Sequence, residues 1–435
     1  MSEPGRHPSP GEPALLRVVG FWSLSAAIVN LTIAGSIFAL PGTLANSMGP
    51  AAPLAYVLGA LLFVPIVVCF AAAGSRVTAT GGPYSYVNAA FGRFPAFATA
   101  AILWISSVAG SGSLSAALID QLSQLFPWLA QPAPRMLFLV AVYGALGALN
   151  SRGIRIGAAA VTTIAAAKVL PLLILTVAGS RYVHLENLHM HAVPSWASIG
   201  SSLVLVVFAY SGIETALAPS GEVRDPIKVV PRAAFAGVAV VFALYIGVQL
   251  VAQGMLGAEL ARNDAPMVAV CEVIFPGGGG LVVIIATLSL LGCLHGDLLG
   301  SSRLIYALAR DRLLPAALSA VSKGTQVPTR AIFAHALVAC LLASAGSFKT
   351  LALLSGGAFC FVYIGVCAAA WRLQRMQVGS SSAIFHLRGS PLIPLLGIAG
   401  LLAILASLRT SEWLAIGCAA LGVSAVYAVR RWPRR

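Results

Sequence analysis

The sequence predicts an all-α integral membrane protein with twelve transmembrane helices. Of its 435 residues, 59% are hydrophobic and only 9% are charged, whereas the surface of a soluble domain of this size needs far more charge. The apolar residues gather in stretches of about 20 residues, the length that crosses a hydrocarbon core of about 30 Å. Two of these stretches, at matching places in two halves of the chain, carry glycine where an unbroken helix is expected.

The predicted helices follow one another through short loops, which leave no room for a separately folded soluble domain. They occupy residues 19–46, 50–74, 94–124, 134–151, 157–180, 199–218, 231–256, 279–309, 329–346, 350–371, 391–408 and 411–430. The third and eighth are longer than a simple crossing, which indicates tilt or an extension beyond the membrane.

Basic residues predict the orientation of these helices. Lysine and arginine gather in the loops on one side and in both terminal segments, whereas each opposite loop carries few. Because cytoplasmic loops are rich in lysine and arginine, we expect both termini on the cytoplasmic side of the cell membrane. An even number of crossings agrees. This topology accounts for the net charge of +14 better than nucleic-acid binding does.

We expect three parts in the chain: a disordered cytoplasmic N-terminus (1–17), a core of ten helices (18–372), and a last part (373–435) with helices eleven and twelve and a basic cytoplasmic tail. The N-terminus lacks the charged-then-apolar pattern of a cleaved signal, so the first helix is expected to remain in the mature protein. The seven cysteines show neither a disulfide framework nor metal-ligand spacing. We therefore expect no metal site.

The two interruptions lie at Thr32–Phe38 and Phe208–Glu214. Lipid cannot satisfy the backbone N–H and C=O groups that a broken helix exposes, so a break is tolerated where it lines a polar cavity. Freed N–H groups at the start of a half-helix suit a carboxylate, and freed carbonyls suit an ammonium group. The breaks fall in helices one and six, which suggests repeats of five helices each, one to five and six to ten. Because five is an odd number of crossings, the second repeat would enter the membrane from the opposite side and so have inverted topology. This pattern predicts the zwitterion site of a secondary transporter.

Four motifs resemble those of the amino acid–polyamine–organocation (APC) superfamily. Ile33–Pro41 resembles its first-helix signature, I-G-S-G-I-F-x-x-P, although Ala34 and Ser36 stand where the family usually has glycine. The second break, with Gly221-Glu222-Val223-x-Asp225-Pro226 and Pro231-Arg232, resembles the sixth-helix signature. Gly81–Tyr86 and Ser302–Pro315 are similar to the inner loop and to the end of the eighth helix. The resemblance implies a LeuT-like fold, with a 5+5 inverted repeat, broken helices one and six, and helices eleven and twelve appended.

The same resemblance implies an amino acid permease that works by alternating access. It places the substrate carboxylate on amides around Gly35, the amino group against carbonyls of both breaks, and the Phe208 ring as a gate. The implied substrate-binding residues are Thr32, Ile33, Ala34, Gly35, Ser36, Ile37, Phe208, Ala209, Ser211, Gly212 and Asp297. A glycine kink or close helix packing would also place small residues at the breaks.

Lys168 is a lone cation in the middle of the fifth helix, about 20 Å along the helix from Arg155. A cation at that depth costs at least about 2.5 kcal/mol unless it is paired or solvated. Similar family members carry a lysine here in the place of a sodium ion. The resemblance therefore implies sodium-independent transport, by proton symport or exchange, with Lys168 as a fixed charge or a proton carrier. Glu214 resembles a family acid linked to gating and coupling; otherwise it would form a hydrogen bond at a helix end.

Asp297 lies near mid-depth in the eighth helix, and the resemblance implies that this part of the helix lies beside the substrate side chain. Three roles stay open: it recognises a cationic side chain, it carries a proton, or it pairs with His295 or Lys168. The first role keeps a polyamine or cationic amino acid carrier as the alternative function. A membrane-embedded enzyme is a remote alternative, because the chain has no H-E-x-x-H or G-x-S-x-G motif and no cofactor cradle. The substrate, the choice between symport and exchange, and the oligomeric state stay open.

Overall fold

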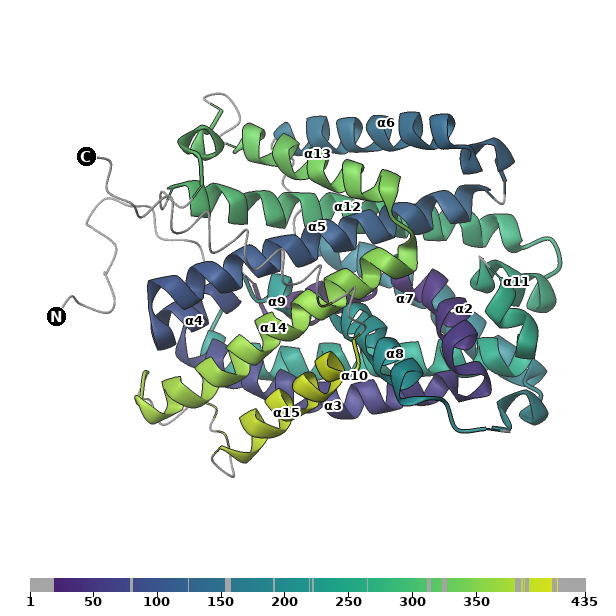
Figure 1. Cartoon of the computed structure of the whole chain (residues 1–435), viewed down its shortest axis with the longest axis horizontal. Coiled ribbons are helices and arrows are strands. Elements are labelled where there is room, and N and C mark those ends of the chain that lie inside the picture. Colours follow the sequence, from purple (N-terminus) through teal and green to yellow (C-terminus); the bar gives the residue numbers. More distant parts are fainter. Residues whose placement is uncertain are drawn as a thin grey trace.

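The computed structural model describes residues 19–408 and Trp413, apart from residues 79–80, 124, 153–157, 191, 219, 221–222, 264, 311–313, 323–326, 380–384, 386 and 388–390; for residues 158–165 and 307 it describes the backbone alone. The described residues form helices, with one isolated β-bridge between Val19 and Val223. Most of the long helices run along the long axis of the molecule (Figure 1).

The first half of the chain, in order, contains α1 (Phe21–Thr32), α2 (Ser36–Met48), α3 (Ala52–Arg76), α4 (Pro83–Phe91), α5 (Arg93–Ser123), α6 (Pro132–Ser151) and α7 (Ala158–Gly179). The second half contains α8 (Trp196–Tyr210), α9 (Ile213–Ala216), α10 (Pro226–Leu256), α11 (Pro266–Ile274), α12 (Gly279–Arg310), α13 (Thr329–Ala345), α14 (Phe348–Arg375) and α15 (Leu392–Ala406). Short 3₁₀ helices in the loops include η6 (Gly257–Arg262).

Seven helical segments among the described residues are long and apolar enough to cross a membrane. They are Ser36–Arg76, Arg93–Ser123, Pro132–Ser151, Trp196–Ala216, Pro226–Arg262, Gly279–Arg310 and Phe348–Arg375. Shorter apolar helices are Phe21–Thr32, Thr329–Ala345 and Leu392–Ala406. The predicted N-terminal part, 1–17, lies outside the described residues, as does the predicted helix at 411–430 apart from Trp413.

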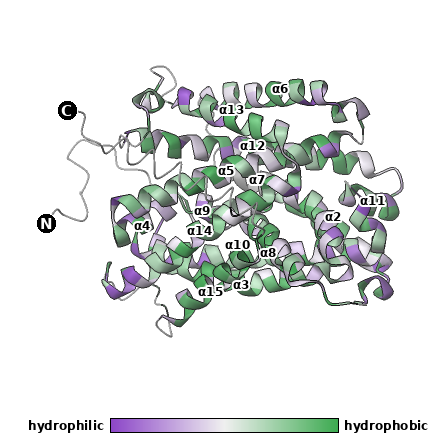
Figure 2. Ribbon diagram, in the orientation of Figure 1, coloured by the Kyte–Doolittle hydropathy of each residue, from purple (hydrophilic) through white to green (hydrophobic). Residues whose placement is uncertain are grey.

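The outer surface of the bundle is apolar, as an integral membrane protein requires. Leu61, Leu137 and Val177 are 65%, 72% and 64% exposed, and lipid chains solvate such side chains where water would not. Figure 2 shows hydrophobic residues along the length of the bundle and hydrophilic residues mostly toward its ends.

Among the described helices, α10 has the largest shift between its predicted and its observed start. α10 starts at Pro226 rather than at 231. Asp225, immediately before it, has a φ of 42°, in the left-handed region that a helix cannot continue through. Proline suits the first helical position because its missing N–H would have no partner there. The boundary is therefore set by the Asp225-Pro226 pair.

Candidate functional site

The structure interrupts helices at both predicted places. α1 ends at Thr32 and α2 begins at Ser36, and α8 ends at Tyr210 while α9 begins at Ile213. Gly212, between α8 and α9, has a φ of 130°, which residues with a side chain rarely adopt. These local geometries turn the chain out of one helix and into the next.

The two interruptions touch each other. A Cβ atom built on Gly212 would lie 2.8 Å from the Leu31 carbonyl carbon and 2.8 Å from the Thr32 nitrogen. Both contacts are with backbone, which cannot move aside as a flexible side chain would. The break after α8 therefore rests directly on the last turn of α1, and glycine is the residue that permits this approach.

The first break is bridged by a residue that the sequence did not single out. The Tyr245 hydroxyl on α10 donates to the Thr32 carbonyl at 3.2 Å and lies 2.8 Å from Ser36 Oγ. Because the Tyr245 hydrogen is directed at Thr32, Ser36 donates in the second contact. The hydroxyl of Ser36, one of the implied substrate-binding residues, is thus bonded to Tyr245.

Small residues at the breaks are closely covered. A Cβ atom on Gly35 would lie 1.7 Å from Leu290 Cδ2, so the α12 side chain occupies the space that any larger residue would need. Ile33, Ile37 and Ala209 are buried, and Ala34 is half-buried. The Gly35 contact shows that helix packing between the first break and α12 uses this glycine.

At the second break, the Phe208 carbonyl already accepts hydrogen bonds from within the protein. Ser211 donates its hydroxyl to the Phe208 carbonyl at 2.7 Å and its N–H to the same oxygen at 3.3 Å. The Phe208 ring lies 6.4 Å, centroid to centroid, from the ring of Phe348 on α14. Of the carbonyls predicted to face an amino group, that of Phe208 therefore already has two donors.

Buried polar atoms without a partner lie on α1 and α12, beside the first break. Within the described part of the chain, Asn30 Oδ1, Thr32 Oγ1 and Ser289 Oγ form no hydrogen bond. Such groups are few in native proteins because each buried polar atom without a hydrogen bond costs about 1–3 kcal/mol. A polar ligand at the break would satisfy them.

Lys168 reaches the same place from α7. Its side chain is 5% exposed, and Nζ donates to the Asn30 carbonyl at 3.5 Å and to Cys293 Sγ at 3.2 Å. Asn30 lies in the last turn of α1, where the helix dipole favours a cation. The lysine is thus placed between α1 and α12 rather than beside an acid.

Glu214 caps the second break from inside. Oε1 accepts the Gly212 N–H at 2.8 Å, and Oε2 accepts the Tyr363 hydroxyl of α14 at 2.9 Å. The side chain is 2% exposed. Its contacts tie α9 to α14 and satisfy an N–H group that the interruption leaves without a helical acceptor.

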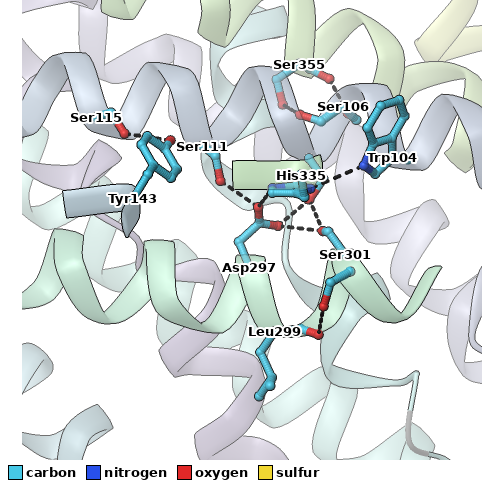
Figure 3. A network of polar contacts seen from close by, with 12 residues as sticks. Trp104, Ser106, Ser111, Ser115, Tyr143, Asp297, Leu299, Ser301, His335 and Ser355 are labelled. Atoms are coloured by element: carbon cyan, nitrogen blue, oxygen red, sulfur yellow. Dashed lines mark hydrogen bonds and ion pairs between the residues drawn. The ribbon is translucent and has the colours of Figure 1, made fainter. Parts of the chain in front are cut away.

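Asp297 lies in a polar cluster between α5, α12 and α13, which we call the Asp297 cluster (Trp104, Ser107, Ser111, Asp297, Ser301 and His335). Ser111 donates to Oδ2 at 2.6 Å, Ser301 donates to Oδ1 at 3.0 Å, and Ser107 also donates to Oδ1. The Ser107 and Ser301 hydroxyl oxygens also lie within hydrogen-bond distance of each other, so one of the two hydroxyl protons can bridge the serines instead of bonding to Oδ1. His335 Nε2 lies 3.2 Å from Oδ2 (Figure 3).

The suggested pairing of Asp297 with His295 or Lys168 was wrong. His295 Nδ1 lies 3.0 Å from Asn150 Nδ2 on α6, and Lys168 contacts α1. Two residues along a helix correspond to a turn of about 200°, so His295 and Asp297 face opposite sides. Apart from Ser301 of α12, the partners lie on α5 and α13 and are distant in sequence.

The chain is similar to known amino acid permeases over most of its length. The family model for "Amino acid permease" matches residues 19–421. The serine/threonine exchanger SteT of Bacillus subtilis (strain 168) is 25% identical, with 96% of this chain and 98% of that protein covered. The branched-chain amino acid permease BcaP of Lactococcus lactis subsp. cremoris (strain MG1363) is 28% identical, with 90% of each covered.

A plant relative matches over a shorter part. The chloroplastic cationic amino acid transporter 9 of Arabidopsis thaliana is 28% identical over 71% of this chain, which spans 58% of that protein's length. The family model covers nearly the whole chain, including both broken helices, the Asp297 cluster and the described membrane helices. The chain belongs to the amino acid permease family.

Proposed function

We propose that this amino acid permease binds the α-amino and α-carboxylate groups of its substrate at the two breaks and moves it by alternating access. The main support for this proposal is the close contact of Gly212 with Leu31 and Thr32, because it brings two interruptions that are far apart in sequence together in space. The start of α2 offers N–H groups for the carboxylate, and the end of α1 offers carbonyls for the ammonium group.

Ties at both ends of the broken helix fit such a cycle. Before α1, the Val19 carbonyl accepts a hydrogen bond from the Arg224 N–H at 2.8 Å. This bond joins the start of the first helix to the segment that follows α9. At the other end, Asn46 Nδ2 on α2 donates to the Ala261 carbonyl of η6 at 3.4 Å. Alternating access requires these ties to open in turn, exposing the break to one side at a time.

The proposal includes a twelve-helix, 5+5 inverted-repeat fold in the cell membrane with both termini in the cytoplasm. It also includes sodium-independent transport. The Lys168 ammonium lies between Asn30 and Cys293. Its positive charge between α1 and α12 would take the place of a coupling sodium ion.

The substrate favoured by these contacts has an uncharged side chain. Glu214 and Asp297, the two acids predicted for the site, both have their carboxylates bonded to protein donors. A cationic side chain would have to displace those donors. The relatives that exchange serine and threonine or carry branched-chain amino acids agree with this preference.

Proteoliposomes loaded with unlabelled amino acid test the proposal. Labelled serine or leucine should enter faster than into protein-free liposomes, and equally well when choline replaces sodium on both sides. Lysine and putrescine, offered in the same assay, should enter slowly or not at all. A strict need for sodium would contradict the role of Lys168, and preferential uptake of lysine or putrescine would establish the cationic alternative.

A further inference from the structure

We propose that the Asp297 cluster is a proton-binding site that couples transport to proton movement, with Asp297 as the proton acceptor. The inference rests on the proposed transport function for its coupling role, but proton binding itself is testable without a substrate. It follows from the hydrogen-bond directions within the cluster, from the balance of charge around it, and from the place of Asp297 on α12.

The hydrogen-bond directions fix the state of His335. Trp104 Nε1 on α5 lies 3.2 Å from His335 Nδ1 and donates to it (Figure 3). An indole nitrogen can only donate, so Nδ1 must carry the lone pair, and the imidazole proton sits on Nε2, facing Asp297. A second proton on His335 would set two N–H groups against each other. His335 is therefore neutral, and its one N–H group, at Nε2, lies 3.2 Å from Asp297 Oδ2 without forming a well-aligned hydrogen bond.

No cation balances Asp297 among the described residues. Neither lysine nor arginine lies within ion-pair distance of its carboxylate, whose close partners are three hydroxyls and a neutral imidazole. Four titratable groups on nearby helices have hydrogen-bond partners of their own. They are Lys168 of α7, His295 of α12, Tyr143 of α6 (bonded to Ser115) and Glu214 of α9. The ionised cluster would carry one uncompensated negative charge at membrane depth.

A proton removes that charge at one of the two carboxylate oxygens. Oδ2 faces the His335 N–H, which cannot turn into an acceptor. Oδ1 faces only Ser107 and Ser301, whose hydroxyls rotate freely between donating and accepting. The proton therefore binds Oδ1, and the new O–H donates to one of these serines. Asp297 keeps 25% side-chain exposure, which gives the proton a route to the carboxyl group.

The cluster is well placed to act on the breaks. A Cβ atom on Gly296 would meet Leu31 Cδ2 of α1 at 3.8 Å, and one on Gly300 would meet Thr215 Cγ2 of α9 at 3.5 Å. Asp297 and Ser301 follow directly and point to α5 and α13. Protonation that loosens α12 from α5 therefore shifts a helix that also contacts α1 and α9.

Infrared difference spectra of the purified protein, acid minus neutral, test proton binding alone. The wild type should show a protonated carboxyl band that Asp297→Asn removes and Glu214→Gln keeps. Asp297→Glu, which retains a carboxyl group, should restore a band if the asparagine variant folds poorly. A wild-type spectrum unchanged by both Asp297 substitutions overturns the proposal. So does loss of the band when sodium replaces choline, since that result identifies a metal-cation site.

Trp104→Phe tests the assigned tautomer. Without the indole donor, Nδ1 can take a proton, so His335 should become charged and the Asp297 carboxyl band should weaken while an imidazolium band appears. Trp196→Phe is the matched control, because Trp196 is 64% exposed and distant in sequence from the cluster. Identical spectra for the two tryptophan variants would overturn the tautomer assigned to His335 and, with it, the argument that Asp297 rather than His335 takes the proton.

Transport assays then test coupling. With membrane potential clamped, an inward proton gradient should stimulate uptake of leucine or serine by the wild type. Asp297→Asn should lose that stimulation while retaining exchange of labelled for unlabelled substrate. Equal stimulation of both proteins overturns the coupling role. If the wild type takes up neither amino acid, the proposed function fails, whereas the infrared result still decides whether protons bind.

Discussion

Gly212→Ala should weaken substrate binding strongly, because it forces the two breaks apart. The new methyl group meets backbone atoms of Leu31 and Thr32 at 2.8 Å, in a conformation with φ of 130°. Backbone strain of this kind costs about 1–3 kcal/mol, and overpacking costs about 1–3 kcal/mol more. The sum, about 2–6 kcal/mol, is released only if α9 moves away from α1.

The lower end of that range corresponds to a roughly 30-fold change in an equilibrium constant. We therefore expect Gly212→Ala to bind leucine or serine at least about 30-fold more weakly, measured by the ligand-induced rise in the thermal unfolding midpoint. Gly144→Ala is the control, since a Cβ atom there meets nothing within 4 Å. If the two variants bind alike, the close contact of the breaks does not form the site.

Three further substitutions test single contacts. Gly35→Ala should reduce uptake because its methyl group would lie 1.7 Å from Leu290 Cδ2, and adding Leu290→Ala should recover part of the loss; additive losses would refute the contact. Tyr245→Phe leaves the buried Ser36 hydroxyl unbonded, at about 1–3 kcal/mol, and removes one of the two donors to the Thr32 carbonyl. The unfolding midpoint should therefore fall, whereas Tyr182→Phe, at a 44% exposed position, should leave it unchanged. Lys168→Gln should lower uptake of serine and leucine more than it lowers the unfolding midpoint, and full uptake by this variant would remove the lysine from the transport cycle.

The sequence predicted the positions of the breaks because they depend on local signals. Glycine and small residues within apolar stretches are visible in the chain itself, and Gly212 adopts a conformation that only its own residue type explains. Most of the described starts of the predicted helices lie within three residues of the predicted positions, whereas the Asp225-Pro226 pair starts α10 five residues early. Glu214 was also within reach, since its first partner is only two residues away.

The residues that the sequence missed act across the fold. Tyr245 reaches Ser36 over 209 positions, and Trp104 reaches His335 over 231. Each residue alone resembles an ordinary membrane-helix side chain, so only packing reveals its role. The partners of Asp297 were mistaken for a related reason. His295 is close in sequence but lies on another side of α12, whereas Ser107 and Ser111 are distant in sequence and share one face of α5.

The two faces of α12 give a physical reason for linking a proton to a substrate. Leu290, Gly296 and Gly300 face the elements that form the breaks, while Asp297 and Ser301 bond to α5. A packed helix moves as a unit because close-packed interiors transmit displacement rather than absorb it. Substrate at the breaks and a proton on Asp297 therefore bias the position of the same helix. By linkage, each must change the affinity for the other by the same factor, so leucine or serine should shift the midpoint of the Asp297 infrared titration in wild-type protein. If a saturating concentration of substrate leaves this midpoint unchanged, the substrate site and the proton site are not energetically coupled, whatever the distance between them.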